Sequence, residues 1–182
     1  LRATSDCIVV GAATLRSERY LPGSVHSEFE EHGLHGPRVA VVTRTFDFAD
    51  DNPALAGDTP LLVLAAQHDV DTHSQQIAHL GSRIELCRAS TDVTGTWIRD
   101  TLTEHGLTRV VCEGGPAVVG PLRRDCVLDE LDVTIAPVLV GAEHLAPAMG
   151  DVAGRLSVLS QAQAGDHTFL RCVVDDATPT LV

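Results

Sequence analysis

Short apolar runs rich in valine and isoleucine recur through the first two thirds of the chain, and helical patterns lie between several of them. Runs of this length that are apolar on both faces are typical of buried parallel strands. The helical pattern of residues 72–80 ends at Gly81, and that of residues 96–105 ends at Gly106, a common residue just after a helix. The predicted strands are residues 7–10, 39–42, 61–65, 83–86 and 110–112. This alternation predicts a layered α/β domain.

Two parts of the chain depart from this pattern, one near its end and one near its start. Residues 131–136 and 168–174 are predicted to be longer strands, joined by a glycine- and proline-containing connection over residues 137–155. Polar and apolar residues alternate along the first of these strands, which indicates one less buried face and an antiparallel end to the sheet. Residues 22–37 are rich in glycine, histidine and glutamate, and we expect them to form an exposed loop.

The length and charge of the chain limit what it can bind. Because 182 residues suffice for one domain with a sizeable core, we expect residues 1–182 to form a single domain. The formal net charge is −12, and all 13 basic residues are arginines. This balance argues against a broad surface for nucleic acid or an anionic membrane, so an anionic ligand must be held locally. No long apolar run or signal peptide is present, and we expect a cytoplasmic protein.

The cysteines and histidines form no recognisable site. The five cysteines lack the C-x-x-C spacing, and we expect them to be reduced core residues. The nine histidines lie singly, without an H-E-x-x-H motif, so no metal site is expected. The sequence has no G-x-S-x-G motif for a nucleophilic serine and no lysine for a Schiff base. These observations argue against hydrolase, metal and lysine chemistry.

Residues 110–120, Val-Val-Cys-Glu-Gly-Gly-Pro-Ala-Val-Val-Gly, pass from an apolar strand through a glycine pair into an apolar helical stretch. Gly114 and Gly115 let a ligand approach the backbone, and Pro116 suits the first turn of a helix. Because a helix N-terminus carries partial positive charge and N–H donors, this turn is a candidate phosphate site. The alternative is a tight connection without a ligand. Glu113 either contacts an amino-substituted ring or a water, or it accepts N–H groups of the turn.

Two earlier predicted strands also end in residues that can contact a ligand at the edge of the sheet. Gly11, followed by small residues, leaves space at the sheet edge where ligands bind in open α/β sheets. Thr14 can donate to a phosphate or cap a helix. Arg44 lies between two threonines after the second strand, and it either grips a phosphate or is a solvated loop residue. The same two interpretations apply to Arg16 and Arg19.

Together and in this order, these segments resemble the reductase domain of the riboflavin-pathway bifunctional deaminase-reductase, the RibD C-terminal domain, which is a relative of dihydrofolate reductase. The resemblance lies in the aspartate-strand-glycine-threonine segment of residues 5–14 and in the strand of residues 37–44. It also lies in Glu113-Gly114-Gly115-Pro116, in Asp129-Glu130-Leu131 and in residues 135–141, which contain an Ala-Pro-x-x-x-Gly pattern. The spacing of these motifs is more specific than any one of them.

The resemblance implies a dihydrofolate reductase-like, three-layer α/β fold with a mostly parallel mixed sheet, antiparallel C-terminal strands and NADPH along the carboxyl ends of its strands. The residues implied to line the nicotinamide and pyrophosphate path are Val10, Gly11, Ala12 and Thr14. Those implied to meet the adenosine 2′-phosphate are Thr43 and Arg44. The turn implied to hold the pyrophosphate comprises Gly114, Gly115, Pro116, Ala117 and Val118.

In the family that the chain resembles, the substrate is an aminopyrimidine ribose phosphate, and hydride transfer reduces its ribosyl group to a ribityl group. The implied catalytic residues are Glu113, which faces the substrate, and Glu18, which stands in for a substrate-binding aspartate. The family's phosphate-binding arginine has no clear counterpart, although Arg19 is nearby. We expect the family's first strand to be missing before residue 1. The resemblance also implies a homodimer, formed through the late strands.

Three other functions remain open at this point. The chain can be a dihydrofolate or pterin reductase of the same fold, or an inactive NADPH-binding paralogue, which the departures over residues 18–22 would explain. A structural protein that binds no nucleotide is the third. Binding and turnover of NADPH distinguish these possibilities.

Overall fold

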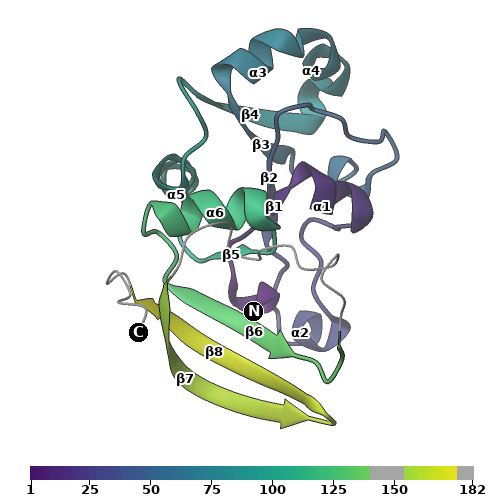
Figure 1. Cartoon of the computed structure of the whole chain (residues 1–182). Helices are drawn as coiled ribbons and strands as arrows, with labels where there is room; N and C mark the ends of the chain where they lie inside the picture. The colour runs from purple at the N-terminus through teal and green to yellow at the C-terminus, as the bar shows by residue number, and fades with distance from the viewer. Residues whose placement is uncertain (140–153, 176–182) are drawn as a thin grey trace.

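The computed structural model describes residues 1–139 and 154–175, and its core is a five-stranded parallel sheet (Figure 1). The strands stand in the order β4-β3-β2-β1-β5, and every neighbouring pair is parallel. Their bounds are β1 Cys7–Gly11, β2 Arg38–Val42, β3 Leu61–Ala66, β4 Ile84–Ala89 and β5 Val110–Cys112. The five strands that the apolar runs predict are confirmed, with small shifts at their ends.

The two faces of this sheet pack against different helices, which gives the domain three layers. One face packs against α1 (Ala12–Ser17), α3 (Gln67–Thr72) and α4 (Ser74–Leu80), through a core that includes Val10 and Leu15. The other packs against α5 (Gly95–Glu104) and α6 (Pro116–Arg124), through a core that includes Val9 and Leu102. Figure 1 shows α1 and α6 on opposite sides of β1. Because successive strand residues point to opposite cores, both must be apolar, which explains the unbroken apolar runs.

The helix predicted over residues 72–80 is two helices in the structure. α3 begins at Gln67 and α4 ends at Leu80, while His73 between them has φ −113° and ψ 31° and interrupts the helix. Val70, in the part that the prediction omitted, is buried against the core. The prediction was wrong at its start because Val70 is the only apolar residue between positions 67 and 71.

The helix predicted over residues 96–105 is confirmed as α5. Thr94 caps its N-terminus, because its hydroxyl oxygen accepts the Trp97 N–H at 3.1 Å. At the other end, Gly106 adopts a φ of 74°, the left-handed conformation that glycine takes without strain. Both ends of this helix are therefore set by local sequence.

The antiparallel C-terminal strands are confirmed, but the prediction that they end one mixed sheet was wrong. They form a separate sheet, in the order β6-β8-β7, which lies below the larger sheet in Figure 1. β6 (Glu130–Ile135) and β8 (His167–Asp175) correspond to the two predicted late strands. β7 (Arg155–Ala164) was not predicted, because each of its residues is exposed and burial imposes no apolar pattern on it. Most of the connection predicted over residues 137–155 lies outside the described residues.

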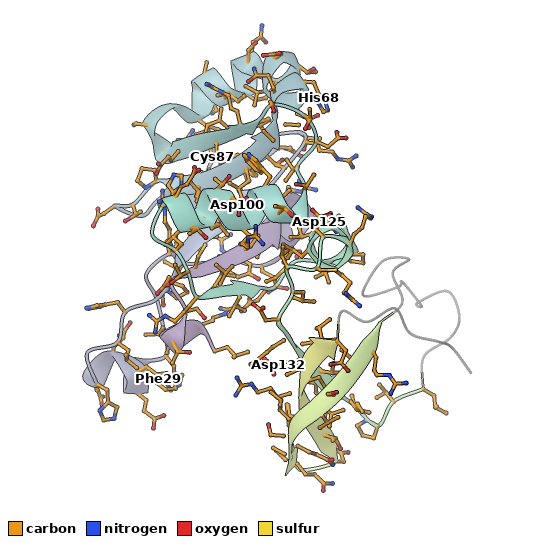
Figure 2. The ribbon with its side chains drawn as sticks, turned by 90° about the vertical axis from the view of Figure 1, so that its left-hand side faces the viewer. Phe29, His68, Cys87, Asp100, Asp125 and Asp132 are labelled. Atoms are coloured by element: carbon orange, nitrogen blue, oxygen red, sulfur yellow. The ribbon has the colours of Figure 1, made fainter. Side chains whose placement is uncertain are left out.

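The insertion over residues 22–37 is mostly exposed, as predicted, but contains a short helix, α2 (Ser27–Glu31). Its two ends are joined where the Gly36 N–H donates to the Gly23 carbonyl at 2.9 Å. Phe29 on α2 and Asp132 on β6 lie at the same end of the molecule (Figure 2). In the described part of the chain, no helix is long and apolar enough to cross a membrane.

The cysteines are free thiols, in agreement with the prediction that they form no disulfides. Cys7 and Cys172 are buried, and burial raises the pKa of Cys7 to about 12. Cys126, however, is exposed, so the expectation that all five lie in the core was wrong at that position.

Candidate cofactor and substrate site

The carboxyl ends of β1 and β5 meet at a pair of glycines. The Glu113 N–H extends the pairing of these strands by donating to the Val9 carbonyl at 3.0 Å. Gly11 ends β1, and a Cβ on Gly114 would come within 3.3 Å of the Gly11 nitrogen and 2.9 Å of the Val118 side chain. A side chain at position 114 therefore cannot fit unless β1 or α6 moves.

Two helices begin at these strand ends. Gly11 is the N-cap of α1, and Gly115 is the N-cap of α6, whose first residue is Pro116. No side chain of the described residues caps either helix. A Cβ on Gly115 would meet no atom of residues 1–139 and 154–175 within 4 Å, so these residues leave the space beside the turn open. The nine-residue α6 thus presents free N–H donors and partial positive charge at this turn, an arrangement that suits an anion.

Some of the predicted cofactor residues offer only backbone atoms to a ligand. Val10 and Val118 are buried in the cores on opposite faces of the sheet. Ala12 packs against the first of these cores. Thr14 differs from them, because it is half-buried and its hydroxyl makes no hydrogen bond within the described residues. A ligand at this edge would therefore meet mainly the backbone of the turn.

Thr43 and Arg44 follow β2 at the same edge of the sheet, but they differ in what they contact. Thr43 is only 3% exposed, and its hydroxyl oxygen accepts the N–H groups of Thr45 and Phe46, both at 3.2 Å. This bonding supports the turn in which Phe46 has a φ of 52°. Arg44 is exposed and makes no hydrogen bond or ion pair with the described residues. Its guanidinium is therefore available to a phosphate.

Arg16 and Arg19 contact the loop that follows β2. Arg16 donates to the Asp47 carbonyl at 3.3 Å, and Arg19 donates to the Asp51 carbonyl at 3.4 Å. The corresponding ion pairs are long, at 3.9 and 3.8 Å, and both arginines are exposed. These contacts favour the interpretation of both as surface residues.

Glu113 is held by two residues that the sequence did not single out. Arg2, from the short helix η1 (Arg2–Thr4), donates through Nε to Oε1 at 2.8 Å and through Nη2 to Oε2 at 2.5 Å. The Tyr20 hydroxyl donates to Oε2 at 3.0 Å. Arg2 also lies over the Tyr20 ring, 5.1 Å from its centroid. The Glu113 carboxylate thus accepts from two side chains rather than from N–H groups of its own turn.

These contacts set the protonation of the cluster. Burial raises the pKa of Glu113, but hydrogen bonds from Arg2 and Tyr20 outweigh it, and the pKa lies below its ordinary value. Burial and the bond to Glu113 raise the pKa of Tyr20 to about 12. The hydrogen bond to Glu113 likewise raises the pKa of Arg2. Near neutral pH, Glu113 is therefore an ionised acceptor and Tyr20 a neutral donor.

Glu18 belongs to the same electrostatic cluster. It is the C-cap of α1 and exposed, and its carboxylate makes no hydrogen bond within the described residues. Its charge contributes to the raised pKa of both Arg2 and Tyr20. The structure thus brings the two predicted catalytic residues to one cluster, with Glu113 half-buried and Glu18 at its rim.

Two surface cavities lie away from this cluster. One has a volume of about 360 Å³ and is lined by residues that include Arg38 and Thr59. The other has a volume of about 520 Å³ and lies between the loop after β2 and α4, lined by residues that include Phe46 and His79. Neither is lined by the glycine pair or Glu113.

The order of the strands and the helices on both faces of the sheet define a dihydrofolate reductase-like α/β fold. Residues 1–168 match the RibD C-terminal domain family, and the chain belongs to that family of oxidoreductases. No curated protein matches the sequence.

Three solved structures show the same fold. A pyrimidine reductase-like protein from Corynebacterium diphtheriae is 24% identical with a TM-score of 0.79, over 96% of this chain and 77% of that one. RibD from Acinetobacter baumannii is 16% identical with a TM-score of 0.71. The match covers 96% of this chain but only 48% of the RibD chain. Riboflavin biosynthesis reductase Rib7 from Saccharomyces cerevisiae is 16% identical with a TM-score of 0.68, and the match covers 96% of this chain and 78% of the Rib7 chain. The predicted fold and family are thus confirmed.

Proposed function

We propose that this chain is an NADPH-dependent reductase that converts the ribosyl group of an aminopyrimidine ribose phosphate to a ribityl group. One observation carries the proposal: the uncapped N-terminus of α6 opens beside the half-buried Glu113 carboxylate. Membership of the RibD C-terminal domain family supports the reaction type. The names of two structural relatives, a pyrimidine reductase-like protein and a riboflavin biosynthesis reductase, support the substrate class.

The cofactor would be held by the backbone of one turn and by one arginine. The turn at Gly114 and Gly115 would bind the pyrophosphate, and Arg44 would bind the 2′-phosphate. Such local donors allow a chain of net charge −12 to bind a polyanion. When bound, NADPH supplies the hydride. The protein's contribution is to orient the reacting groups and to fix the charges around them.

Glu113 orients the substrate in this proposal. Reduction adds one hydride and one proton, but Glu113 is ionised and the Tyr20 hydroxyl is directed at Glu113, so water rather than either side chain supplies the proton. The carboxylate instead accepts an N–H or O–H group of the substrate. Glu18 is a second acceptor at the exposed rim of the same cluster.

The test is oxidation of NADPH by the purified protein in the presence of 5-amino-6-(5-phosphoribosylamino)uracil. We expect turnover of this compound and little turnover of dihydrofolate. The opposite preference would assign a pterin reductase. Tight NADPH binding without turnover of either compound would indicate an inactive paralogue, and no thermal shift with NADPH would rule out the cofactor.

The partner that we propose is a second copy of the chain, bound through the three-stranded sheet. The strand register places Ile135, Leu156 and Val158 on the same face as the buried Cys172. These three side chains are nevertheless 53%, 41% and 58% exposed. The opposite face carries polar residues such as Thr134 and Asp132, together with the exposed Phe169. An apolar strip of this kind is typical of an interface, and a homodimer would cover it.

A further inference from the structure

The contacts around Glu113 leave its carboxylate one open acceptor position. An ionised carboxylate has about four lone-pair positions. Arg2 Nε occupies one on Oε1, while Arg2 Nη2 and the Tyr20 hydroxyl occupy two on Oε2. No other side chain among residues 1–139 and 154–175 donates to this group. The remaining acceptor position is therefore on Oε1, and it is available to an N–H or O–H group of a ligand.

We infer that Tyr20 is a positioning residue that acts through Glu113. Together with Arg2 it fixes the charge and direction of the carboxylate, so that Oε1 accepts an N–H or O–H group of the substrate. The identity of that substrate, an aminopyrimidine, rests on the proposed function.

Tyr20 is the rigid member of the cluster. It is 5% exposed, and its ring belongs to the same core as Leu15 and Val10. The Arg2 side chain, by contrast, is 52% exposed. An exposed arginine alone holds a carboxylate loosely, because solvent competes for both groups. The hydroxyl of the buried ring donates from a fixed point, so it sets the orientation of the carboxylate plane.

The charged side chains of the cluster around Glu113 are Arg2, which pairs with it, and Glu18, which adds a second negative charge. Tyr20 and the half-buried thiol of Cys112 are the other titratable groups whose pKa responds to the charge of the carboxylate. Because Arg2 pairs with Glu113 directly, it offsets the charge that a phosphorylated substrate would meet there.

Loss of the Tyr20 hydroxyl would change substrate recognition more than folding. A Phe at this position keeps the ring beneath Arg2 but removes one donor from Oε2. The pKa of Glu113 would then rise, since hydrogen bonds to the ionised form lower it. A protonated or misdirected Glu113 is a poorer acceptor, so the substrate would bind more weakly, while the glycine turn would be unaffected.

The first test uses the fact that Tyr20 is the only tyrosine in the chain. The absorbance of tyrosinate therefore reports the ionisation of Tyr20 alone. After a rapid jump to high pH, this absorbance can be recorded before the protein unfolds. We expect a midpoint near 12 in the wild type. In Glu113→Gln the midpoint should fall, because the negative charge is gone. An unchanged midpoint would overturn the inference.

The second test compares Tyr20→Phe with Thr101→Val, which removes a buried hydroxyl from α5 on the opposite face of the sheet. In Tyr20→Phe we expect KM for 5-amino-6-(5-phosphoribosylamino)uracil to rise about tenfold, the value for one charge-assisted hydrogen bond. The acid limb of kcat/KM should move to higher pH, and Kd for NADPH should not change. Thr101→Val should leave all three as in the wild type.

The outcomes separate this inference from the proposed function. A Tyr20→Phe protein with wild-type KM and pH profile overturns the inference, even if its Tm is lower. A wild-type protein that does not turn over the aminopyrimidine overturns the proposed function and, with it, the substrate named here. In that case the tyrosine titration still decides whether Tyr20 and Glu113 are coupled.

Discussion

Asp6 joins the starts of β1 and β5 by holding both the backbone and the side chain of Arg109. Its Oδ2 accepts the N–H groups of Thr108 at 3.0 Å and Arg109 at 2.8 Å, and its Oδ1 accepts Nη2 of Arg109 at 2.7 Å. The Asp6 N–H in turn donates to the Arg109 carbonyl at 2.7 Å. This contact fixes the register of the two strands whose other ends form the glycine turn. The bonds from Arg109 hold the pKa of Asp6 well below its ordinary value.

Asp6 should therefore make the stability of the domain depend on pH in acid. A carboxyl whose pKa is lowered in the folded state stabilises the protein above its unfolded pKa, about 3.9 for aspartate. That contribution is lost as the pH falls toward the folded pKa. We expect the free energy of unfolding in urea to fall as the pH is lowered from about 5 to about 2, and to fall less in Asp6→Asn. Equal losses in the two proteins would show that Asp6 contributes nothing.

The strands of the large sheet could be predicted because burial on both faces makes their consecutive residues apolar. Val9 and Val10 face opposite cores, so neither position tolerates a polar side chain. The glycine turn could also be predicted, since Gly114 has no room for a Cβ and Gly115 begins a helix at Pro116. In each case one local requirement acts on adjacent residues.

The partners of Glu113 could not be predicted in this way. Arg2 and Tyr20 are 111 and 93 residues from Glu113 along the chain, and only the order of β1 and β5 in the sheet brings them together. The one available signal was that Tyr20 is the sole tyrosine. The role of Thr43 could not be predicted for another reason. The sequence shows a hydroxyl after a strand, but it does not show that this hydroxyl oxygen already accepts two N–H groups of the following turn.

The two glycines of the turn should respond differently to alanine. In Gly114→Ala the new Cβ would lie 2.9 Å from Val118, and we expect a loss of about 1–3 kcal/mol in the free energy of unfolding. In Gly115→Ala the Cβ meets nothing within 4 Å, so the loss should be below about 1 kcal/mol. Urea unfolding of both variants measures the difference. Equal destabilisation would mean that the close approach of Gly114 to α6 is unimportant.

Gly115→Ala also tests the proposed pyrophosphate site. Its Cβ would stand in the open space beside the α6 N-terminus, so we expect weaker NADPH binding from a variant of nearly normal stability. Titration of NADPH against intrinsic fluorescence measures this. Wild-type affinity in Gly115→Ala would place the pyrophosphate elsewhere.

Arg44→Gln should remove the preference for NADPH over NADH. Arg44 has no partner within the described residues, so the change costs no internal ion pair and stability should be unaffected. Loss of a charged hydrogen bond to the 2′-phosphate corresponds to about 1.5–3 kcal/mol, or a rise of about tenfold to a hundredfold in Kd for NADPH. Kd for NADH should not change.

Arg99→Gln is the matched control for Arg44→Gln. Arg99 is an exposed arginine on α5 whose side chain pairs, within the described residues, only with its neighbour Asp100, so its loss should leave both affinities unchanged. If Arg44→Gln retains the wild-type preference, or if Arg99→Gln weakens NADPH binding equally, Arg44 does not recognise the 2′-phosphate.

Neighbouring residues of β6 allow a sharp test of the proposed homodimer. Ile135 shares a face with the buried Cys172, whereas Thr134 points to the opposite face. Both positions are exposed, so an aspartate at either should be tolerated by the monomer fold. An aspartate at position 135 would place a charge within the apolar interface, where an unpaired charge is costly. We expect Ile135→Asp to sediment as the 19.3 kDa monomer, while the wild type and Thr134→Asp sediment at twice that mass. A monomeric wild type would contradict the proposal, and dissociation by Thr134→Asp alone would place the interface on the polar face of the sheet.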